Sequence, residues 1–122
     1  MVKVLHYREL IVWQKAMHLA KQIYEITRRF PADERYGLVS QMRRSAVSVP
    51  SNIAEGQARH TSGEFVQSLS HAEGSLAELE TQLLLSVELS FCGKESAQDL
   101  LELISEVRRM LMALRKRVEP LR

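Results

Sequence analysis

The stretch FVQSLSHAEGSLAELETQLLLSVELS (Phe65–Ser90) decides the fold, because its apolar and small residues recur at alternating steps of three and four. The recurring positions are Phe65, Leu69, Ala72, Leu76, Leu79, Leu83, Ser86 and Ser90. Such spacing places their side chains in one stripe along a helix of about seven turns. Thr61 and Glu64 have the spacing of a capping box, and Gly93 is expected to end the helix. The stretch therefore predicts a long helix with one buried side.

Three other segments show the same rhythm and are predicted to form helices: residues 8–30, residues 34–55, and residue 97 to near Pro120. Their stripes consist of Trp13, Ala16, Ala20, Ile23, Thr27 and Phe30; of Leu38, Met42, Ser45, Val49, Ile53 and Gly56; and of Ala97, Leu100, Ile104, Val107, Leu111, Leu114, Val118 and Leu121. Pro31, Gly56 and Pro120 are expected to end these helices, and Asp33 is a candidate N-cap for the second. No segment shows the alternation of a strand.

Four amphipathic helices with short connections predict an all-α fold, an up-down-up-down four-helix bundle. A chain of 122 residues can bury one core, so residues 1–122 are expected to form a single domain. Apolar residues make up 45% of the chain and charged residues 26%, which is the balance of a folded protein.

The N-terminus MVKVLHYREL has no apolar run typical of a signal peptide, and no segment reaches the roughly 18 apolar residues that span a bilayer. Cys92 is the single cysteine, which fits a reducing compartment and a role as a small buried side chain. We therefore expect a cytoplasmic protein without membrane contacts.

Pro50 lies inside the second predicted helix and lacks the N–H group that would bond to the Ala46 carbonyl. We expect a kink at Pro50. The compact residues around it, such as Val49 and Ala54, would let a neighbouring helix approach closely.

A polar ridge follows the same helix at steps of three and four and consists of Gln41, Arg44, Ser48, Asn52, Glu55 and Arg59. It is either a solvated face or a polar seam where helices or subunits meet. Ser48 and Asn52 favour the seam, because they are short, poor helix formers suited to specific hydrogen bonds. Glu55 is the best acid or base candidate, but pairing with Arg59 one turn later is the simpler expectation.

The charges are segregated along the chain. Between Thr61 and Glu106 there are nine acids and one base, Lys94, although the net charge is only +2. The basic residues outside this region include arginine pairs, and arginine is suited to bidentate contact with phosphate. The candidate nucleic-acid-binding residues are Arg28, Arg29, Arg43, Arg44, Arg59, Arg115, Lys116 and Arg117. The alternative is that Arg43 and Arg44 form structural ion pairs with the acidic third or fourth helix.

No motif of a metal site or an enzyme is found. A di-metal bundle uses Glu-x-x-His pairs, and no histidine here has a glutamate three residues before it. HExxH, a phosphate-binding glycine loop and GxSxG are also missing from the sequence. We expect no metal, no cofactor and no catalytic residue.

Apolar residues outside the stripes favour self-association, because a single bundle would leave many of them exposed. They are Val12, Leu19 and Ile26; Leu84, Leu85, Leu89 and Phe91; and Leu101, Leu103, Met110 and Met112.

The segments YRELIVWQKAMHLAKQIYEIT, FPADERYGLVSQMRRSAVSVPSNIAEG and FVQSLSHAEGSLAELE carry a family resemblance. Over residues 7–118 the chain closely resembles the four-helix-bundle proteins encoded in intervening sequences of bacterial 23S ribosomal RNA genes. The resemblance implies a cytosolic homo-oligomer, typically a ring of five bundles, without an assigned enzymatic activity. One relative is the accessory variability determinant of diversity-generating retroelements, a basic nucleic-acid-binding accessory of the reverse transcriptase.

The residues that we assign to the fold or to assembly are Trp13, Tyr36, Gly37, Gln41, Ser48, Pro50, Asn52, Glu55, Gly56, Gly74 and Glu78. The chain departs from the family pattern at His71 and Glu73, which make the third helix less positive than in relatives, and Ser45 replaces a usual alanine.

Two functions follow as hypotheses. The first is a non-enzymatic, homo-oligomeric scaffold, a pentamer by resemblance, that binds structured RNA or DNA through arginine contacts to backbone phosphates. The alternative is a protein-interaction or assembly scaffold that binds no nucleic acid.

Overall fold

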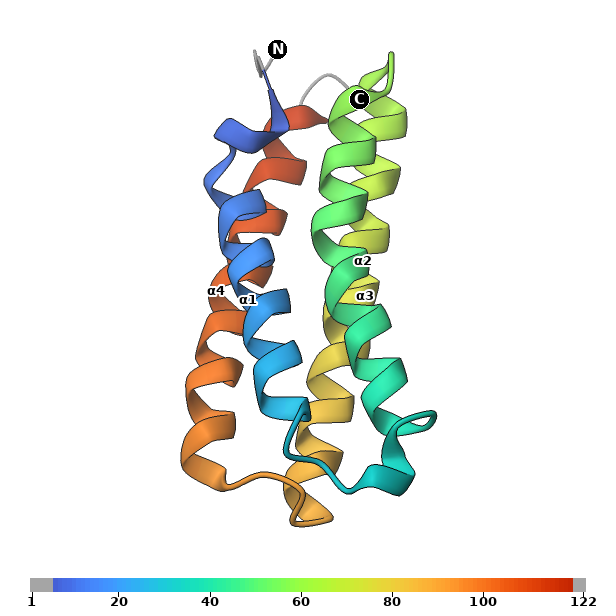
Figure 1. The fold of residues 1–122 in the computed structure, drawn as a ribbon. Coiled ribbons are helices and arrows are strands. Elements are labelled where there is room, and N and C mark those ends of the chain that lie inside the picture. The colour runs from blue at the N-terminus through green and yellow to red at the C-terminus, as the bar shows by residue number, and fades with distance from the viewer. Residues whose placement is uncertain (1–5, 120–122) are drawn as a thin grey trace.

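The long helices of the computed structural model, which describes residues 6–119, are α1 (Ile11–Thr27), α2 (Leu38–Ala58), α3 (Ser62–Glu88) and α4 (Lys94–Val118). Short 3-10 turns precede α1 at Tyr7–Glu9 (η1) and α2 at Ala32–Glu34 (η2). The long helices run alternately down and up, with α1 and α2 in front in Figure 1. Both α1 and α3 pack against α2 and α4. The prediction of an all-α, up-down-up-down four-helix bundle is confirmed.

Most of the core consists of residues of the predicted stripes. Leu69, Leu76, Leu79 and Leu83 of α3 are completely buried, and residues from each of the other three helices pack against them. Thr61 caps α3 as predicted, since its hydroxyl oxygen accepts a hydrogen bond from the Glu64 amide at 3.1 Å. The alternating three-four spacing therefore identified the buried side of each helix correctly.

The end of α3 differs from the prediction. The helix stops at Glu88, and Ser90 adopts a left-handed conformation with φ of 64°. The Phe91 amide then donates to the Ser86 carbonyl at 2.8 Å, and the Ser90 amide to the Val87 carbonyl at 3.0 Å. These two bonds form a Schellman motif. Ser90 therefore ends the helix, and Gly93 is instead the N-cap of α4.

The start of α2 also differs. The helix begins at Leu38 instead of residue 34, because Gly37 has backbone angles that interrupt the preceding turn (φ −108°, ψ −111°). A carboxylate oxygen of Glu34 accepts a hydrogen bond from the Leu38 amide at 3.2 Å. The side chain of Glu34 thus caps the first backbone amide of α2, and the prediction of Asp33 as the N-cap is wrong.

Gly56 does not end α2, which continues to Ala58. It is buried where α2 meets α3, and a Cβ atom at this position would lie 2.6 Å from the Ser68 Cβ and 2.9 Å from the Phe65 Cδ1. Gly56 therefore allows the close approach of two helices. Pro50 lies buried within α2, and the kink there stays a prediction. Pro120 and Leu121 lie outside the described residues.

Most of the apolar residues outside the stripes are covered by the bundle itself. Val12 and Leu19 are buried, and five others pack against the core while partly buried: Ile26, Phe91, Leu101, Leu103 and Met110. The exposed ones are Leu84, Leu85, Leu89 and Met112, and Ile11, Met17 and Val47 are also exposed. Among the described helices, none has the length and apolar character needed to cross a membrane.

Candidate nucleic-acid interface

The predicted basic residues lie at opposite ends of the bundle. Arg28 and Arg29 follow the end of α1, and Arg43 and Arg44 lie in the second turn of α2, so all four lie near the α1–α2 turn (Figure 1). Arg59 follows α2, and Arg115–Arg117 lie in the last turn of α4, at the other end. The structure therefore does not unite them in one patch.

Arg43 is held in place by α1. Its Nε donates to the Thr27 hydroxyl at 3.0 Å, and its Nη2 donates to the Tyr24 carbonyl at 3.3 Å. The guanidinium also lies over the Tyr24 ring, 4.5 Å from the centroid, which is a cation–π contact. Thr27 is buried and donates its own proton to the Ile23 carbonyl at 2.7 Å, so its oxygen is fixed as the acceptor. These contacts orient the guanidinium before any ligand arrives.

These contacts leave Arg43 able to bind an anion. A guanidinium has five N–H groups, and the two hydrogen bonds to α1 use one each from Nε and Nη2. Arg44 is exposed and has no hydrogen bond or ion pair within residues 6–119. Neither arginine pairs with an acid of α3 or α4, so the alternative of structural ion pairs there is wrong for the single chain.

Two hollows surround these arginines, and they add residues that the sequence analysis did not select. One is lined by Tyr24, Arg35, Tyr36, Val39, Ser40, Arg43, Arg44, Val47 and Ser48. The other is lined by Thr27, Arg28, Phe30, Pro31, Ala32, Arg35, Val39 and Arg43. Both share Arg35 and Arg43, and neither lining includes an aspartate or glutamate. We call Arg28, Arg35, Arg43 and Arg44 the arginine cluster.

Arg35 was missed because it is not part of an arginine pair. The available signal was the dipeptide Arg35-Tyr36 in the polar turn PADERYG, a cation next to an aromatic residue beside the α2 start. In the structure the Arg35 guanidinium lies 5.9 Å from the Tyr36 ring centroid.

At the opposite end, part of the basic charge is already neutralised. Arg115 of α4 donates to Glu73 of α3 at 2.7 Å and lies 3.7 Å from Glu119. Its hydrogen bond to Glu73 raises the pKa of Arg115. Arg59 pairs with Glu55 at 2.7 Å, as expected from their spacing. Lys116 and Arg117 are exposed and have no partner in the described part of the chain.

Three acids of α3 and α4, namely Glu73, Glu80 and Glu106, form ion pairs with bases of neighbouring helices. Arg108 of α4 pairs with Glu80 of α3 at 2.6 Å, and Lys15 of α1 pairs with Glu106 of α4 at 3.0 Å. Glu73, which departs from the family pattern, has a clear structural role as the partner of Arg115. These three ion pairs join neighbouring helices, and none of them involves a residue of the arginine cluster.

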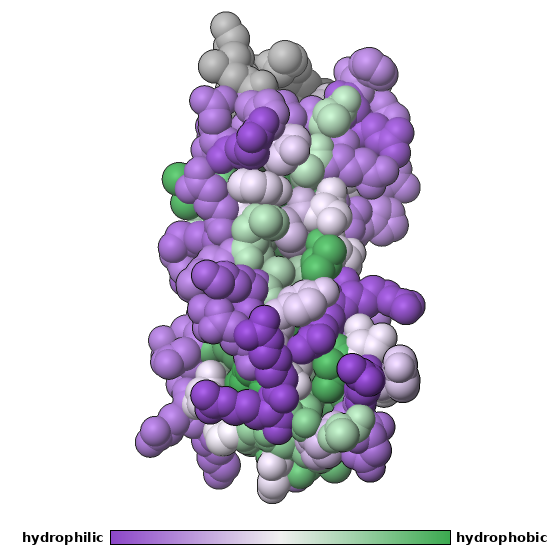
Figure 2. Space-filling model, viewed as in Figure 1, coloured by the Kyte–Doolittle hydropathy of each residue, from purple (hydrophilic) through white to green (hydrophobic). Residues whose placement is uncertain are grey.

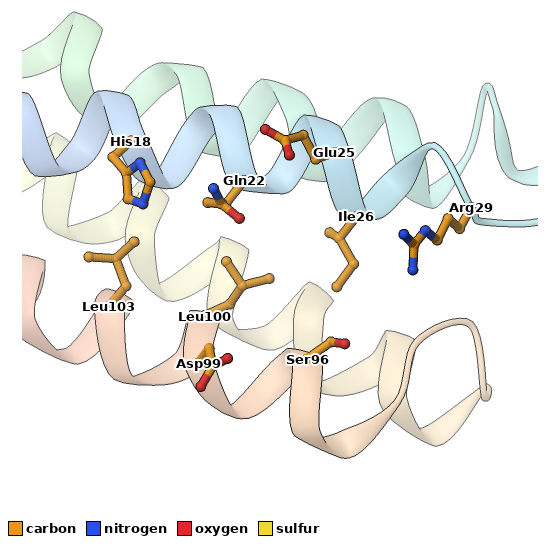
Figure 3. Close-up of a pocket in the computed structure, with 9 residues that line it drawn as sticks. All are labelled: His18, Gln22, Glu25, Ile26, Arg29, Ser96, Asp99, Leu100 and Leu103. Carbon is orange, nitrogen blue, oxygen red and sulfur yellow. The ribbon is translucent and has the colours of Figure 1, made fainter.

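Arg29 faces away from the arginine cluster and lines a third hollow, between α1 and α4 (Figure 3). His18, Gln22, Ile26 and Arg29 project toward α4 there, and Leu100 and Leu103 project back toward α1. Glu25 and Asp99 also line this hollow. Because it carries acids and bases alike, it is not suited to a polyanion.

Part of the polar ridge of α2 faces α3, at Ser48. The hydroxyl oxygens of Ser48 and Ser75 lie 2.7 Å apart, and the Asn52 side-chain amide donates to the Ser48 carbonyl at 2.8 Å and to its hydroxyl at 3.0 Å. A polar seam between helices is therefore present at Ser48. Gln41, Glu55, Gly74 and Glu78 are exposed, and among residues 6–119 the Glu55–Arg59 pair is their one side-chain hydrogen bond or ion pair.

An apolar groove adjoins the arginine cluster between α1 and α2. It is lined by Tyr7, Trp13, Met17, Ala20, Lys21, Tyr24, Val47, Pro50, Ser51 and Ala54. Figure 2 shows this face as a band of apolar and weakly polar side chains between hydrophilic borders. Trp13 is half-buried there with its ring 5.4 Å from that of Tyr7. Tyr24 and Val47 line both the groove and the first arginine hollow.

The described residues provide no clustered ligands for a metal ion, since no group of three or more His, Cys, Asp or Glu side chains gathers among residues 6–119. Glu55 is exposed and bound to Arg59 instead of lying in a pocket.

Comparison with known proteins finds both a family and solved structures that are similar to this chain. The family model described as 23S rRNA-intervening sequence protein matches residues 8–113. A crystal structure from Bacteroides thetaiotaomicron, described as a protein with unknown function from the S23 ribosomal protein family, superposes with a TM-score of 0.76. That match covers 86% of this chain and 98% of the other at 22% identity, so it shows a shared fold. None of the curated proteins matches the sequence significantly.

Proposed function

Because the chain belongs to the 23S rRNA-intervening sequence protein family, we propose that it is a non-enzymatic, cytoplasmic scaffold that binds structured RNA or DNA through its arginine cluster. The observation that carries this proposal is the set of unmatched arginines around two acid-free hollows. Arginine forms bidentate, charge-assisted bonds to phosphate, and a cluster without carboxylates has no internal competitor for that contact.

The scaffold is proposed to be a homo-oligomer, a pentamer by family resemblance. The groove between α1 and α2 and the exposed Leu84, Leu85 and Leu89 support this, because apolar surface of this kind is typical of subunit contacts. Repeating the arginine cluster around a ring would build a strong local field from a chain whose net charge is only +2.

The test is a binding titration of purified, nuclease-treated protein with a fluorescent structured RNA and a duplex DNA over a series of salt concentrations. Affinity should fall steeply with salt, with a slope of about −0.9 per phosphate contacted on duplex DNA. Light scattering on the same samples gives the number of subunits. Absence of binding to both ligands at low salt would refute the proposal.

A pair of double variants locates the interface. R43E/R44E alters the arginine cluster, and K116E/R117E alters exposed charges at the opposite end. Each changes the formal net charge from +2 to −2, since every substitution replaces a positive charge with a negative one. We expect R43E/R44E to weaken binding similarly for unrelated sequences, because phosphate contacts carry little sequence information. If both variants lose the same amount of affinity, binding depends on the net charge of the protein and not on the position of the arginine cluster.

The second candidate is a protein-interaction scaffold that binds no nucleic acid, and the apolar groove favours it. A protein of this kind should purify without nucleic acid and show no salt-dependent binding. It should also keep its partner contacts in R43E/R44E and lose them when Met17 and Val47, two exposed residues of the groove, are changed to serine.

A further inference from the structure

We infer that the arginine cluster takes an unpaired nucleotide, whose base stacks on Tyr36 while the adjoining phosphates contact Arg35, Arg43 and Arg44. This inference rests on the proposed function and adds the class of nucleic acid that is bound. Tyr36 was assigned above to the fold or assembly signature, and the structure gives reason to assign it to the ligand instead.

Tyr36 contributes almost nothing to the packing of the bundle. Its side chain is 88% exposed, the largest exposure among the large hydrophobic residues described. Its only ring contact in residues 6–119 is the Arg35 guanidinium, 5.9 Å from the centroid. By contrast, Tyr24 is 39% exposed, and the Arg43 guanidinium lies 4.5 Å from its ring centroid. An aromatic ring that is almost fully exposed to water contributes little to the stability of the fold, so we assign Tyr36 a role in binding.

The surroundings of Tyr36 fit a nucleotide. The hollow that it lines has a volume of about 640 Å³, within the range of pockets that hold drug-sized ligands, and a nucleotide belongs to that size class. Arg35, Arg43 and Arg44 line the same hollow and supply the positive charge. Aromatic platforms beside a basic groove are the combination by which proteins bind single-stranded nucleic acid.

Stacking on Tyr36 requires a base whose face is free. In a duplex both faces of each base are covered by neighbouring bases, so a duplex would present only phosphates to the cluster. A loop, bulge or single strand can turn a base outward onto an aromatic side chain. The α1–α2 connection, which carries Tyr36, lies at one end of the bundle, where a strand can approach it (Figure 1).

The experiment compares three labelled ligands of equal length at one salt concentration: a single strand, the same strand with abasic sites, and the duplex. RNA and DNA versions of the single strand form separate arms. The abasic strand keeps the phosphates and loses the bases, so it should bind roughly 5- to 150-fold more weakly than the normal strand if one base stacks. Tighter binding of the normal strand in either arm supports the inference.

Two variants of Tyr36 are compared with the unchanged protein on the same ligands. Tyr36→Ala should weaken binding of the normal strand by the same factor and leave the abasic strand unaffected. Tyr36→Phe keeps the ring and should bind the normal strand as the unchanged protein does. Because the side chain is 88% exposed, both variants are expected to fold, which a circular dichroism spectrum verifies.

The outcomes separate this inference from the proposed function. Equal affinity for the normal and abasic strands, with no effect of Tyr36→Ala, overturns stacking and leaves the phosphate contacts standing. Failure of every ligand to bind overturns the proposed function and the inference with it. A changed subunit number in Tyr36→Ala places the residue at a subunit contact and also overturns the inference.

Discussion

Ser48 of α2 and Ser75 of α3 place their hydroxyl oxygens 2.7 Å apart where the two helices pack. Ser48 also accepts a hydrogen bond from Asn52, one turn further along α2. The contact joins two residues that are 27 positions apart in the sequence, and it is a polar contact between helices that also share the apolar core. Such a bond fixes how far one helix can slide along the other.

The Ser48–Ser75 bond can be measured by a double-mutant cycle. Ser48→Ala, Ser75→Ala and the double variant are unfolded in urea, and the free energies of unfolding are compared. We expect a coupling of roughly 0.5–1.5 kcal/mol, the net worth of a typical hydrogen bond. Strict additivity of the single effects would show that the hydroxyl groups do not interact in solution.

Gly56→Ala should destabilise the bundle by about 1–3 kcal/mol, because the new methyl group would overlap Ser68 and Phe65 of α3. Gly74→Ala is the matched control, since a Cβ there meets nothing within 4 Å. Replacing a glycine inside a helix by alanine should stabilise by about 0.5–1 kcal/mol in that open site. The midpoint temperature of thermal unfolding should thus fall in Gly56→Ala and rise in Gly74→Ala. A rise in both variants would contradict the close approach of α2 and α3 at Gly56.

Ser90→Gly should stabilise the protein. Ser90 ends α3 with φ of 64°, a conformation that costs an L-residue roughly 1–2 kcal/mol and costs glycine little. Part of that gain is offset by the greater freedom of glycine in the unfolded chain, so we expect a net increase of about 1 kcal/mol in urea unfolding. Ser90→Ala keeps the strain and serves as the control, and a glycine variant no more stable than the alanine variant would refute the left-handed geometry.

Thr27→Val should weaken nucleic-acid binding without changing its salt dependence. The substitution keeps the side-chain shape and removes the oxygen that accepts from the Nε of Arg43. Arg43 keeps its charge but loses part of its orientation, so affinity should fall about two- to tenfold, the worth of one hydrogen bond. The slope of log affinity against log salt should match that of the unchanged protein. A reduced slope would mean that a phosphate contact is lost as well, contrary to a purely positioning role for Thr27.

Cys92 should react slowly with iodoacetamide in the folded protein, because burial raises the pKa of its thiol and only the thiolate reacts. At a mildly alkaline pH the folded chain therefore holds less thiolate than the unfolded chain, which urea provides as the control. The raised pKa also makes the free energy of unfolding depend on pH. Well below the ordinary thiol pKa it has no effect, because the thiol is protonated in both the folded and the unfolded chain. As the pH rises through that value, the unfolded chain loses its proton first, so the free energy of unfolding falls. Equal rates in the folded and unfolded chains would contradict the burial.

The sequence was sufficient for the helices and their buried sides, because stripes such as that of α3 depend only on local spacing. It was insufficient at the helix ends, because more than one nearby residue could cap or end the same helix. Asp33 and Glu34 are both capable of capping a helix, and only the backbone at Gly37 selects Glu34. Gly56 has the composition of a helix end, but its role depends on Ser68 of another helix.

The candidate site was predicted in part. Arg43 and Arg44 were found because arginine pairs are visible in a sequence. The partners of Arg43 on α1 were not, since Tyr24 and Thr27 precede it by 19 and 16 residues and meet it only after folding. For the same reason the sequence could not show that Arg115 is neutralised by Glu73, or that Arg35 joins the cluster.

The even number of helices has a practical consequence for work on this molecule. The start of α1 and the end of α4 lie at one end, and the turn with Tyr36 lies at the other (Figure 1). The 21 residues of α2 span about 30 Å between the two ends. A reporter or affinity handle fused before α1 or after α4 is thus kept a helix length away from the arginine cluster, and a chain immobilised through either fusion still presents that end to solution.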